Sequence, residues 1–409
     1  MAEKWTKASL DGLSQQIKEE ASGKRVEEEL MLAFYQDFGV LPLRNAMQNL
    51  EQENQVRSGR ALQGAFQNIP AIICGAGPSL ERSFALLKQM GDKGLIFGAG
   101  SALGPLSKHH IPVHCLVACD PDPPMERFVG QSYFQAPLFY QNQVSTSLLR
   151  SHQGAKVCMG ESGSFPLEKW WEEGFWNEPF DVGWSVGTFA TSIAAFCGCS
   201  PIYLVGIDLC VSENKGYALG VEGIDESNNW AFASDCFGNR QATRPDFLMS
   251  KAWLEYFAKK RPENPLINVS QGLVLEGIAE GSLPCITHSI DLFGRVHQVI
   301  EKAPLLPLGC ARFKTKQVEE SVDRIQTLLK QWMECIQDER SRILCTCALE
   351  EELFYQFHLL PMWAIWKPLL QEEEGIGALE CPMIEKQLQE MLFYQYVTKQ
   401  WIDGRQILP

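Results

Sequence analysis

The chain has 409 residues, 45% of them hydrophobic, which is enough for one large domain and smaller ones, each with its own core. Its 36 basic and 50 acidic residues give a net charge of −14, the wrong sign for wrapping nucleic acid or coating an anionic membrane. The composition therefore excludes a disordered chain and argues against a polyanion-binding protein. A local basic pocket for one phosphate group remains compatible with it.

The cysteines and the apolar segments predict a cytoplasmic protein. The 14 cysteines have irregular spacings and no C-x-x-C pair, which argues against a zinc ribbon or a thioredoxin-type site. No apolar signal segment follows Met1. The most apolar late stretch, residues 358–370, is too short to span a bilayer and contains Pro361 and Pro368. We therefore expect a soluble protein with reduced, mostly buried cysteines.

Apolar residues first recur at helical spacing, as at Leu10, Leu13 and Ile17 and again at Leu30 and Phe34. This pattern, embedded in dense charge, predicts an N-terminal helical cap over residues 1–66. We expect no chemistry from it.

Short apolar runs then alternate with helix-length segments. The runs cover residues 71–74, 95–97, 113–119, 137–140, 156–159 and 202–205. Runs that are apolar on both faces are typical of a buried parallel sheet with helical crossovers. The sequence therefore predicts an α/β fold, with a Rossmann-like, mostly parallel sheet over residues 67–308. Ligands of such sheets bind at the carboxyl ends of the strands.

Helical spacing returns after Leu308 and predicts a C-terminal helical domain over residues 309–409. One stripe runs through Val318, Val322, Ile325, Leu329, Trp332 and Ile336, and a second through Leu388, Leu392 and Tyr396. We expect both stripes to be core.

The first predicted strand runs into the turn Gly75-Ala76-Gly77-Pro78-Ser79-Leu80. Two glycines allow a tight turn and a close approach of the backbone to a ligand, and the N–H groups of the following helix favour an anion. Leu80 stands where the dinucleotide fingerprint has its third glycine. A tight turn without any ligand explains this motif equally well.

The second strand repeats the design in Gly98-Ala99-Gly100-Ser101. Two glycine turns at neighbouring strand ends would expose a shallow floor of backbone amides, which favours a ligand. The third strand ends in Asp120-Pro121-Asp122, where carboxylates can bind a metal ion or ribose hydroxyls. The alternative is a proline-stiffened turn with solvated acids, which suits Asp122 better than Asp120.

A helix of small residues opens with Ser185-Val186-Gly187-Thr188. Ser185 and Thr188 either cap this helix or donate to a phosphate or carboxylate, because both partners occupy the same place. The strand at residues 202–205 then leads into Gly206-Ile207-Asp208.

These ordered blocks resemble the domain shared by bacterial motility accessory factor (Maf) glycosyltransferases and archaeal 6-hydroxymethylpterin diphosphokinases (MptE-like). A more distant resemblance is to bacterial sialyltransferases that use CMP-sialic acid. The resemblance covers roughly residues 67–280 and continues more faintly through Gly238, Asn268 and Gly272. It implies that Asn268 and Gly272 close the sheet and border the site.

One position departs from the pattern of these families. Many relatives carry a histidine, a plausible general base, in a loop after the G-I-D block, whereas this loop reads Asn214-Lys215-Gly216-Tyr217-Ala218. A tyrosine with the reference pKa of about 10 is a poor base at neutral pH. Tyr217 is therefore the candidate at the catalytic position, and the usual base is absent or comes from elsewhere.

The resemblance implies a Maf-like glycosyltransferase that passes a nucleotide-activated sugar, such as a CMP-linked nonulosonic acid, to a protein or glycan hydroxyl. Asp120 and Asp208 would orient hydroxyls or a metal ion, and Ser185, Gly187 and Thr188 would hold the sugar or phosphate. The residues that would cradle the nucleotide phosphate are Gly75, Gly77, Ser79, Gly100 and Ser101.

Two alternatives stay open. The first is an MptE-like diphosphokinase that transfers pyrophosphate from ATP to a pterin alcohol, with magnesium held by Asp120 and Asp122. The second is a non-catalytic nucleotide-binding or scaffold protein, which Tyr217 suggests. A dehydrogenase is disfavoured, because the third glycine and the acidic residue after the second strand are missing.

Overall fold

The computed structural model describes residues 34, 37–52, 55–128, 133, 135–160, 166–173, 180–211, 217–218, 221, 231–283, 291–307, 309–373 and 383–406. The chain divides into two compact units. We call the unit of residues 45–163 and 171–313 the sheet unit, and the unit of residues 1–44, 164–170 and 314–409 the helical unit. Most of the predicted N-terminal cap, including Leu10, Leu13, Ile17 and Leu30, lies outside the described residues.

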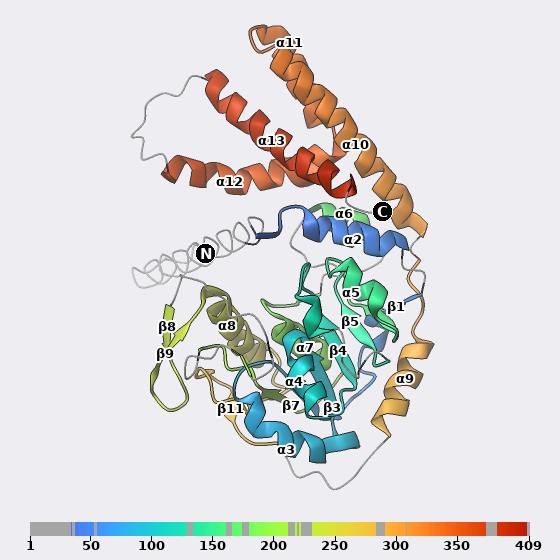
Figure 1. Ribbon diagram of the computed structural model, residues 1–409, viewed down its shortest axis with the longest axis vertical. Coiled ribbons are helices and arrows are strands. Elements are labelled where there is room, and N and C mark those ends of the chain that lie inside the picture. Colours follow the sequence, from blue (N-terminus) through green and yellow to red (C-terminus); the bar gives the residue numbers. More distant parts are fainter. Residues whose placement is uncertain are drawn as a thin grey trace, which may run out of the picture. The chain divides into compact units, whose positions relative to one another are not determined.

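A nine-stranded sheet, with every neighbouring pair parallel, is the centre of the sheet unit (Figure 1). Its order is β1-β6-β5-β4-β3-β2-β7-β10-β11. The strands are β1 (Val56–Ser58), β2 (Ala71–Cys74), β3 (Leu95–Ala99), β4 (Cys115–Ala118), β5 (Leu138–Tyr140), β6 (Lys156–Cys158), β7 (Ile202–Val205), β10 (Leu266–Asn268) and β11 (Ala279–Glu280). The predicted Rossmann-like α/β fold is confirmed.

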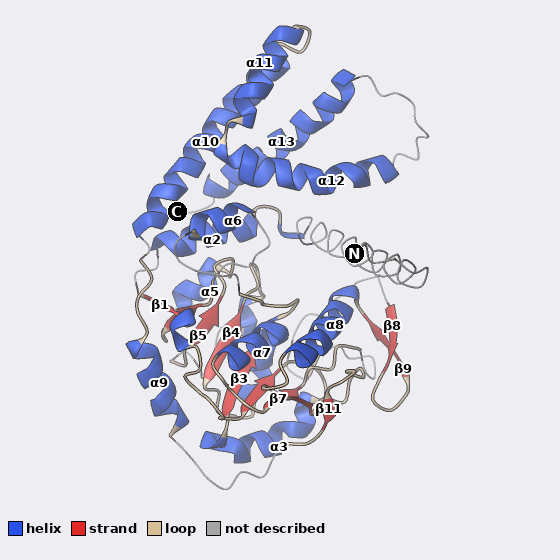
Figure 2. Cartoon of the chain, turned by 180° about the vertical axis from the view of Figure 1, so that it is seen from behind, coloured by secondary structure: helices blue, strands red, loops and turns tan. Residues whose placement is uncertain are grey.

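Helices cover both faces of this sheet, as Figure 2 shows. Alternate residues of each strand enter different cores: Ile73 and Phe97 pack with the residues of α7 and α9, whereas Ile72 and Ile96 pack with those of α3 and α4. The helices of the sheet unit are α3 (Leu80–Met90), α4 (Leu103–Lys108), α5 (Thr146–Ser151), α7 (Val186–Phe196), α8 (Pro245–Lys260) and α9 (Leu292–Lys302). Burial on both faces explains why these strands are continuous apolar runs in the sequence.

The predicted runs include neither β1, β10 and β11 of the sheet nor a hairpin outside it. The strand β1 lies inside the range expected to be helical, because a three-residue edge strand is too short to show a period of its own. An antiparallel hairpin of β8 (Ala231–Ser234) and β9 (Arg240–Thr243) precedes α8. Its inward face carries alanines and polar residues, so it has no apolar alternation in the sequence.

The helical unit confirms one predicted stripe and contradicts the other. In α10 (Gly309–Glu334), Val318, Val322 and Trp332 are fully buried, as expected. In α13 (Met383–Gln406), however, Leu392 and Tyr396 of the expected stripe are 50% and 59% exposed. The buried face of α13 is formed by Met391, Tyr394, Val397 and Trp401. Apolar residues occur on several faces of α13, so spacing alone does not identify the face that packs.

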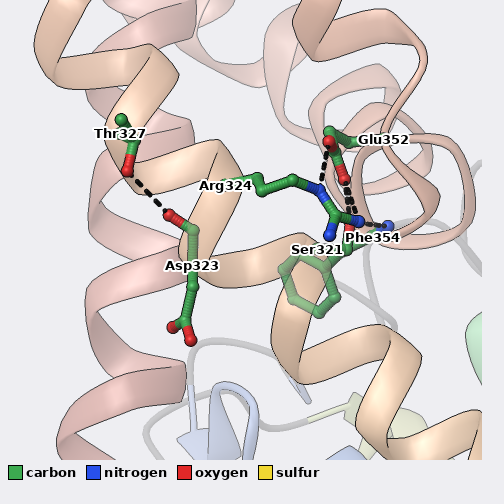
Figure 3. Close-up of polar contacts among 6 residues, drawn as sticks. All are labelled: Ser321, Asp323, Arg324, Thr327, Glu352 and Phe354. Carbon is green, nitrogen blue, oxygen red and sulfur yellow. Dashed lines mark hydrogen bonds and ion pairs between the residues drawn. The ribbon is translucent and has the colours of Figure 1, made fainter.

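Polar contacts tie α10 to the turn that follows α11 (Glu339–Glu350), as Figure 3 shows. Arg324 donates to both carboxylate oxygens of Glu352, at 2.8 and 3.1 Å. Ser321 also donates to Glu352, at 2.8 Å, and accepts from the Phe354 N–H at 3.1 Å. The remaining helices are α2 (Leu41–Gln52), α6 (Pro166–Glu172) and α12 (Leu360–Glu373), the last preceded by a π-helical turn at Tyr355–Leu359. None of the described helices has the length and apolarity needed to cross a bilayer.

Candidate functional site

The strand order creates a topological switch point between β2 and β7. From β2 the chain moves through β3, β4, β5 and β6 to one side of the sheet, and it then returns to place β7 on the other side of β2. Connections that leave in opposite directions open a crevice at the carboxyl ends of the two strands, where ligands of open α/β sheets bind. The first glycine turn follows β2 and the Gly206–Asp208 segment follows β7, so both lie at this switch point.

Close approach of the two strand ends explains the glycines of the first turn. The N–H of Gly75 donates to the Val205 carbonyl and that of Gly77 to the Gly206 carbonyl, both at 2.8 Å. A Cβ at Gly75 would lie 2.5 Å from the Gly206 oxygen, and one at Gly77 would lie 2.6 Å from Asp208 Oδ2. The turn therefore needs glycine for packing, and these two amides already have partners within the protein.

Asp208 joins the end of β7 to the start of α3. Its side chain is buried, with Oδ2 accepting from the Ser79 N–H at 2.8 Å and Oδ1 accepting from the Ser79 hydroxyl. Burial raises the pKa of Asp208, and this effect outweighs the hydrogen bonds from Ser79 and the charge of Arg82, which lower it. The structure thus brings Asp208 and Ser79 together, and the carboxylate holds the glycine turn in place.

The loop after β10 closes over Asp208. A Cβ at Gly272 would lie 1.9 Å from the Asp208 carbonyl oxygen, and the Leu273 N–H donates to that oxygen at 2.9 Å. Asn268, at the end of β10, is buried and donates to Glu280 at 2.9 Å. The positions predicted to close the sheet therefore lie next to the switch point.

The second glycine turn meets the start of α7. Gly100 has a φ of +47°, a backbone region that favours glycine, and a Cβ there would lie 3.6 Å from the Val186 side chain. Ser101 follows it, half-buried, in the 3₁₀ turn Gly100–Ala102. Conformation, and not crowding, is thus the reason for glycine at this position.

Ser185 and Thr188 form a capping box at the N-terminus of α7. The Ser185 hydroxyl accepts from the Thr188 N–H at 3.2 Å, and the Thr188 hydroxyl accepts from the Ser185 N–H at 2.8 Å. Gly187 lies between them, where a Cβ would be 2.9 Å from the end of the Ile207 side chain. The sequence left two roles open for Ser185 and Thr188, and the structure shows capping. The contact of Gly187 with Ile207 places this helix start beside the switch point.

Asp120 and Asp122 follow β4, two positions away from β2 in the sheet order. Both side chains are exposed, and the main-chain oxygen of Asp120 accepts from the Ser145 N–H at 3.1 Å. Within the part of the chain that the structure describes, no three histidine, cysteine or acidic side chains are grouped as metal ligands. The two aspartates are thus on the correct edge of the sheet but apart from the Asp208 cluster.

Tyr217 lies close to the first glycine turn. The N–H of Ala218 donates to the Ala76 carbonyl at 2.8 Å, and Tyr217 itself is half-buried. Residues 214–216 of the same loop lie outside the described residues. The loop that carries Tyr217 therefore reaches the first glycine turn through Ala218.

Sequence reasoning missed one element near this edge, and it missed the contacts of a helix that it had predicted. The turn of the β8–β9 hairpin, in which Gly238 has a φ of +81°, contacts the loop over Asp208 through a bond of 3.0 Å from the Cys236 N–H to the Gly272 carbonyl. In α2, Asn45 and Asn49 bind the turns after β4 and β5. Two asparagines four residues apart, in a helix that also carries apolar residues such as Ala46, Met47 and Leu50, were a signal that could have been used.

The strand order and the glycine turns define the class: a Rossmann-like α/β domain with its switch point at β2 and β7. A comparison with protein families matches residues 44–214 to the family described as 6-hydroxymethylpterin diphosphokinase MptE-like, which confirms the resemblance seen in the motifs. A comparison with curated proteins found no match.

Two solved structures are similar to this chain. The Maf glycosyltransferase from Magnetospirillum magneticum AMB-1 has a TM-score of 0.60 and 16% identity over 89% of this chain, which spans 58% of that protein. The sialyltransferase CstII from Campylobacter jejuni, in complex with the substrate analogue cytidine-5'-monophosphate, has a TM-score of 0.27 and 13% identity, with 55% of this chain and 89% of that chain covered. The first likeness establishes a shared fold.

Proposed function

We propose that this chain is a cytoplasmic glycosyltransferase that transfers a sugar from a nucleotide donor of the CMP type, such as a CMP-linked nonulosonic acid, to a protein or glycan hydroxyl. The observation that carries the proposal is the convergence of both glycine turns, Asp208 and the N-terminus of α7 at the switch point. The fold likeness to a Maf glycosyltransferase also extends over 89% of the chain, well beyond the matched residues 44–214. That extent favours a glycosyltransferase over a minimal metabolic kinase.

In this proposal the donor phosphate lies between the Gly100–Ser101 turn and the first turn of α7. The N–H groups of a first helical turn have no intrahelical partner and favour an anion. The Thr188 N–H is taken by the cap, which leaves the N–H groups of Val186 and Gly187 for the phosphate. Gly75, Gly77 and Ser79 would form the wall of the crevice, fixed by Asp208.

The remaining candidates would act on hydroxyl groups. Asp120 would accept a hydrogen bond from a donor hydroxyl, because a carboxylate at a strand end can bind ribose hydroxyls. Tyr217 would border the transferred group, and its hydroxyl can donate or accept a hydrogen bond. Magnesium, if used, would be held by Asp120 and Asp122 and would neutralise phosphate charge.

A diphosphokinase that uses ATP and magnesium is the second candidate. It is favoured by the match of residues 44–214 to the MptE-like family. In that case Asp120 and Asp122 would hold the magnesium ion between the protein and the phosphates.

A thermal-shift experiment with CMP, CDP, UDP, ADP, ATP and NAD, each with and without magnesium, separates the two candidates. A ligand at 100 times its Kd adds about 2.7 kcal/mol of stability. Cytidine-selective stabilisation, followed by release of CMP from a CMP-sugar in the presence of an acceptor, is the expected result. Magnesium-dependent stabilisation by adenine nucleotides would move the kinase to first place.

The control variant for this experiment is Asp120→Asn, because the exposed Asp120 side chain can be changed without disturbing a core. Substitutions of Gly77 are unsuitable as binding controls, since any Cβ there collides with Asp208 in the ligand-free protein. Absence of stabilisation by every nucleotide would refute both catalytic proposals and leave the non-catalytic alternative.

A further inference from the structure

The helix α2 carries three buried amide side chains, Asn45, Gln48 and Asn49, and two of them have main-chain partners at the sheet. Asn45 and Asn49 are 5% and 2% exposed, and Ala46, Met47 and Leu50 beside them are also buried. Residues four apart in a helix lie one above the other on the same face. Because burial of an amide in apolar surroundings is costly unless it is hydrogen-bonded, the partners of these two side chains indicate why they are asparagines.

Both asparagines donate to main-chain carbonyls at the carboxyl edge of the sheet. Asn45 donates to the Pro121 oxygen at 2.8 Å and to the Gln143 oxygen at 3.1 Å. Asn49 donates to the oxygens of Asn142 and Val144, both at 2.8 Å. Asn45 therefore holds the turn after β4 together with the turn after β5, whereas Asn49 holds the turn after β5 alone.

The composition of the turn after β4 makes such a clamp necessary. Pro121 and Pro123 have no N–H, so the main chain here can be fixed mainly through its carbonyl oxygens. The Asp120 oxygen accepts from the Ser145 N–H at 3.1 Å, and the next oxygen, that of Pro121, accepts from Asn45. Two successive carbonyls are thus held, which fixes the direction in which the exposed Asp120 side chain leaves the backbone.

We propose that Asn45 is a positioning residue that sets where Asp120 meets the nucleotide ligand. This inference rests on the proposed function, in which Asp120 contacts a hydroxyl or a metal ion of that ligand. The helix α2 is then part of the site through main-chain contacts, although it precedes the first sequence motif of the domain.

Asn45→Ala and Asn49→Ala form a matched pair of variants. Each removes one buried amide that donates to two carbonyls from the same helix, and only Asn45 donates directly to the Asp120 turn. Asn49 reaches that turn only through the Val144–Ser145 peptide group, whose N–H donates to the Asp120 oxygen. Titrations use CMP, and ATP with magnesium, as probes. We expect Asn45→Ala to weaken binding of the nucleotide that the unaltered protein prefers by about tenfold or more, as outer-shell substitutions do. Asn49→Ala should weaken binding clearly less, because its contact with the Asp120 turn is indirect.

A double variant tests whether Asn45 acts through Asp120. In the Asp120→Ala background, Asn45→Ala should weaken binding no further, because coupled residues are not additive. Equal losses in Asn45→Ala and Asn49→Ala, or additive losses in the double variant, would overturn the inference. Asn45→Leu, which keeps the side-chain volume, serves as the second variant if Asn45→Ala does not fold.

Amide hydrogen exchange of the ligand-free protein separates this inference from the proposed function. Asn45→Ala should accelerate exchange in peptides that contain Asp120 and Asp122, and Asn49→Ala mainly in those from residues 141–146. If no nucleotide binds, the proposed function fails while the exchange data still decide whether Asn45 fixes the turn. Unchanged exchange around Asp120 in Asn45→Ala would refute the positioning role.

Discussion

Replacement of Asp208 tests whether its carboxylate holds the glycine turn. Asp208→Ala leaves the buried Ser79 N–H and hydroxyl without their acceptor. Each unsatisfied donor costs about 1–3 kcal/mol, and part of this loss is offset because no charge is buried any longer, so we expect a net loss of about 2–4 kcal/mol. Asp208→Asn can still accept from the Ser79 N–H and donate to its hydroxyl. Asp208→Asn should therefore lower the free energy of unfolding by about 1 kcal/mol or less at pH 7.

Native-state hydrogen exchange of the β2 and β7 amides measures these losses for the sheet unit alone. Ser79→Ala, which removes only the hydroxyl bond to Asp208, is the control and should cost about 1 kcal/mol. Stability of Asp208→Ala equal to that of the unaltered protein would refute the role of Asp208. An equal loss in Asp208→Asn would show that charge, and not the pair of hydrogen bonds, is what matters.

The pH dependence of the same variants has a defined sign. Burial raises the pKa of Asp208 in the folded protein, while the unfolded chain has the ordinary value of about 3.9. The stability that protonated Asp208 contributes is therefore complete below the unfolded pKa and is lost as the pH rises through the folded pKa. The stability of Asp208→Asn relative to that of the unaltered protein should therefore increase as the pH is raised from about 4.

Three further predictions concern single side chains. Gly77→Ala should lower the melting temperature of the sheet unit far more than Gly187→Ala. The new Cβ at position 77 would meet Asp208 and a backbone oxygen at 2.6–2.8 Å, whereas the one at position 187 would meet only the movable end of the Ile207 side chain. Equal shifts in melting temperature would contradict this reasoning. Burial lowers the pKa of His358 to about 3, so the stability that neutral His358 contributes is present above about pH 6.5 and is lost as the pH falls towards 3. His358→Phe should therefore make the stability of the helical unit less dependent on pH in acid. An unchanged acid unfolding curve would exclude His358 as the cause. Ser321→Ala should lower the free energy of unfolding in chemical denaturation by about 1–3 kcal/mol, because it leaves the Phe354 N–H unpaired. Arg324→Ala should lower it by only about 0.5 kcal/mol, because the Arg324 side chain is half-exposed. The reverse order would refute this account.

Much of the sheet could be predicted because its strands are buried on both faces. The runs at residues 71–74 and 202–205 match β2 and β7, and the run at 113–119 contains β4 at Cys115–Ala118. Short edge elements such as β1 could not be found, since three residues show no periodicity. The buried face of α13 was also assigned wrongly, because the helix that packs against it determines which of its apolar faces is covered.

The candidate site was only partly readable. Glycine pairs after two strands predicted a floor of exposed amides for a ligand, and at the first pair the structure shows close packing against the Gly206–Asp208 segment instead. Their spacing could not reveal that the Gly77 N–H donates to Gly206, because a glycine that faces a ligand and one that faces another strand have the same sequence. The role of Asn45 was missed, since the carbonyls that it binds belong to turns 76 and 98 residues further along the chain.

The sequence by itself determined the long buried strands and the main helical segments, because hydrophobic periodicity is a local property of the chain. Only the tertiary structure decided the order of the strands, since a crossover of given length can place the next strand on either side of the sheet. The return of the chain to β7 beside β2 brings Asp208 to Ser79 across 129 residues of sequence. That contact depends on strand order, and no local pattern encodes it.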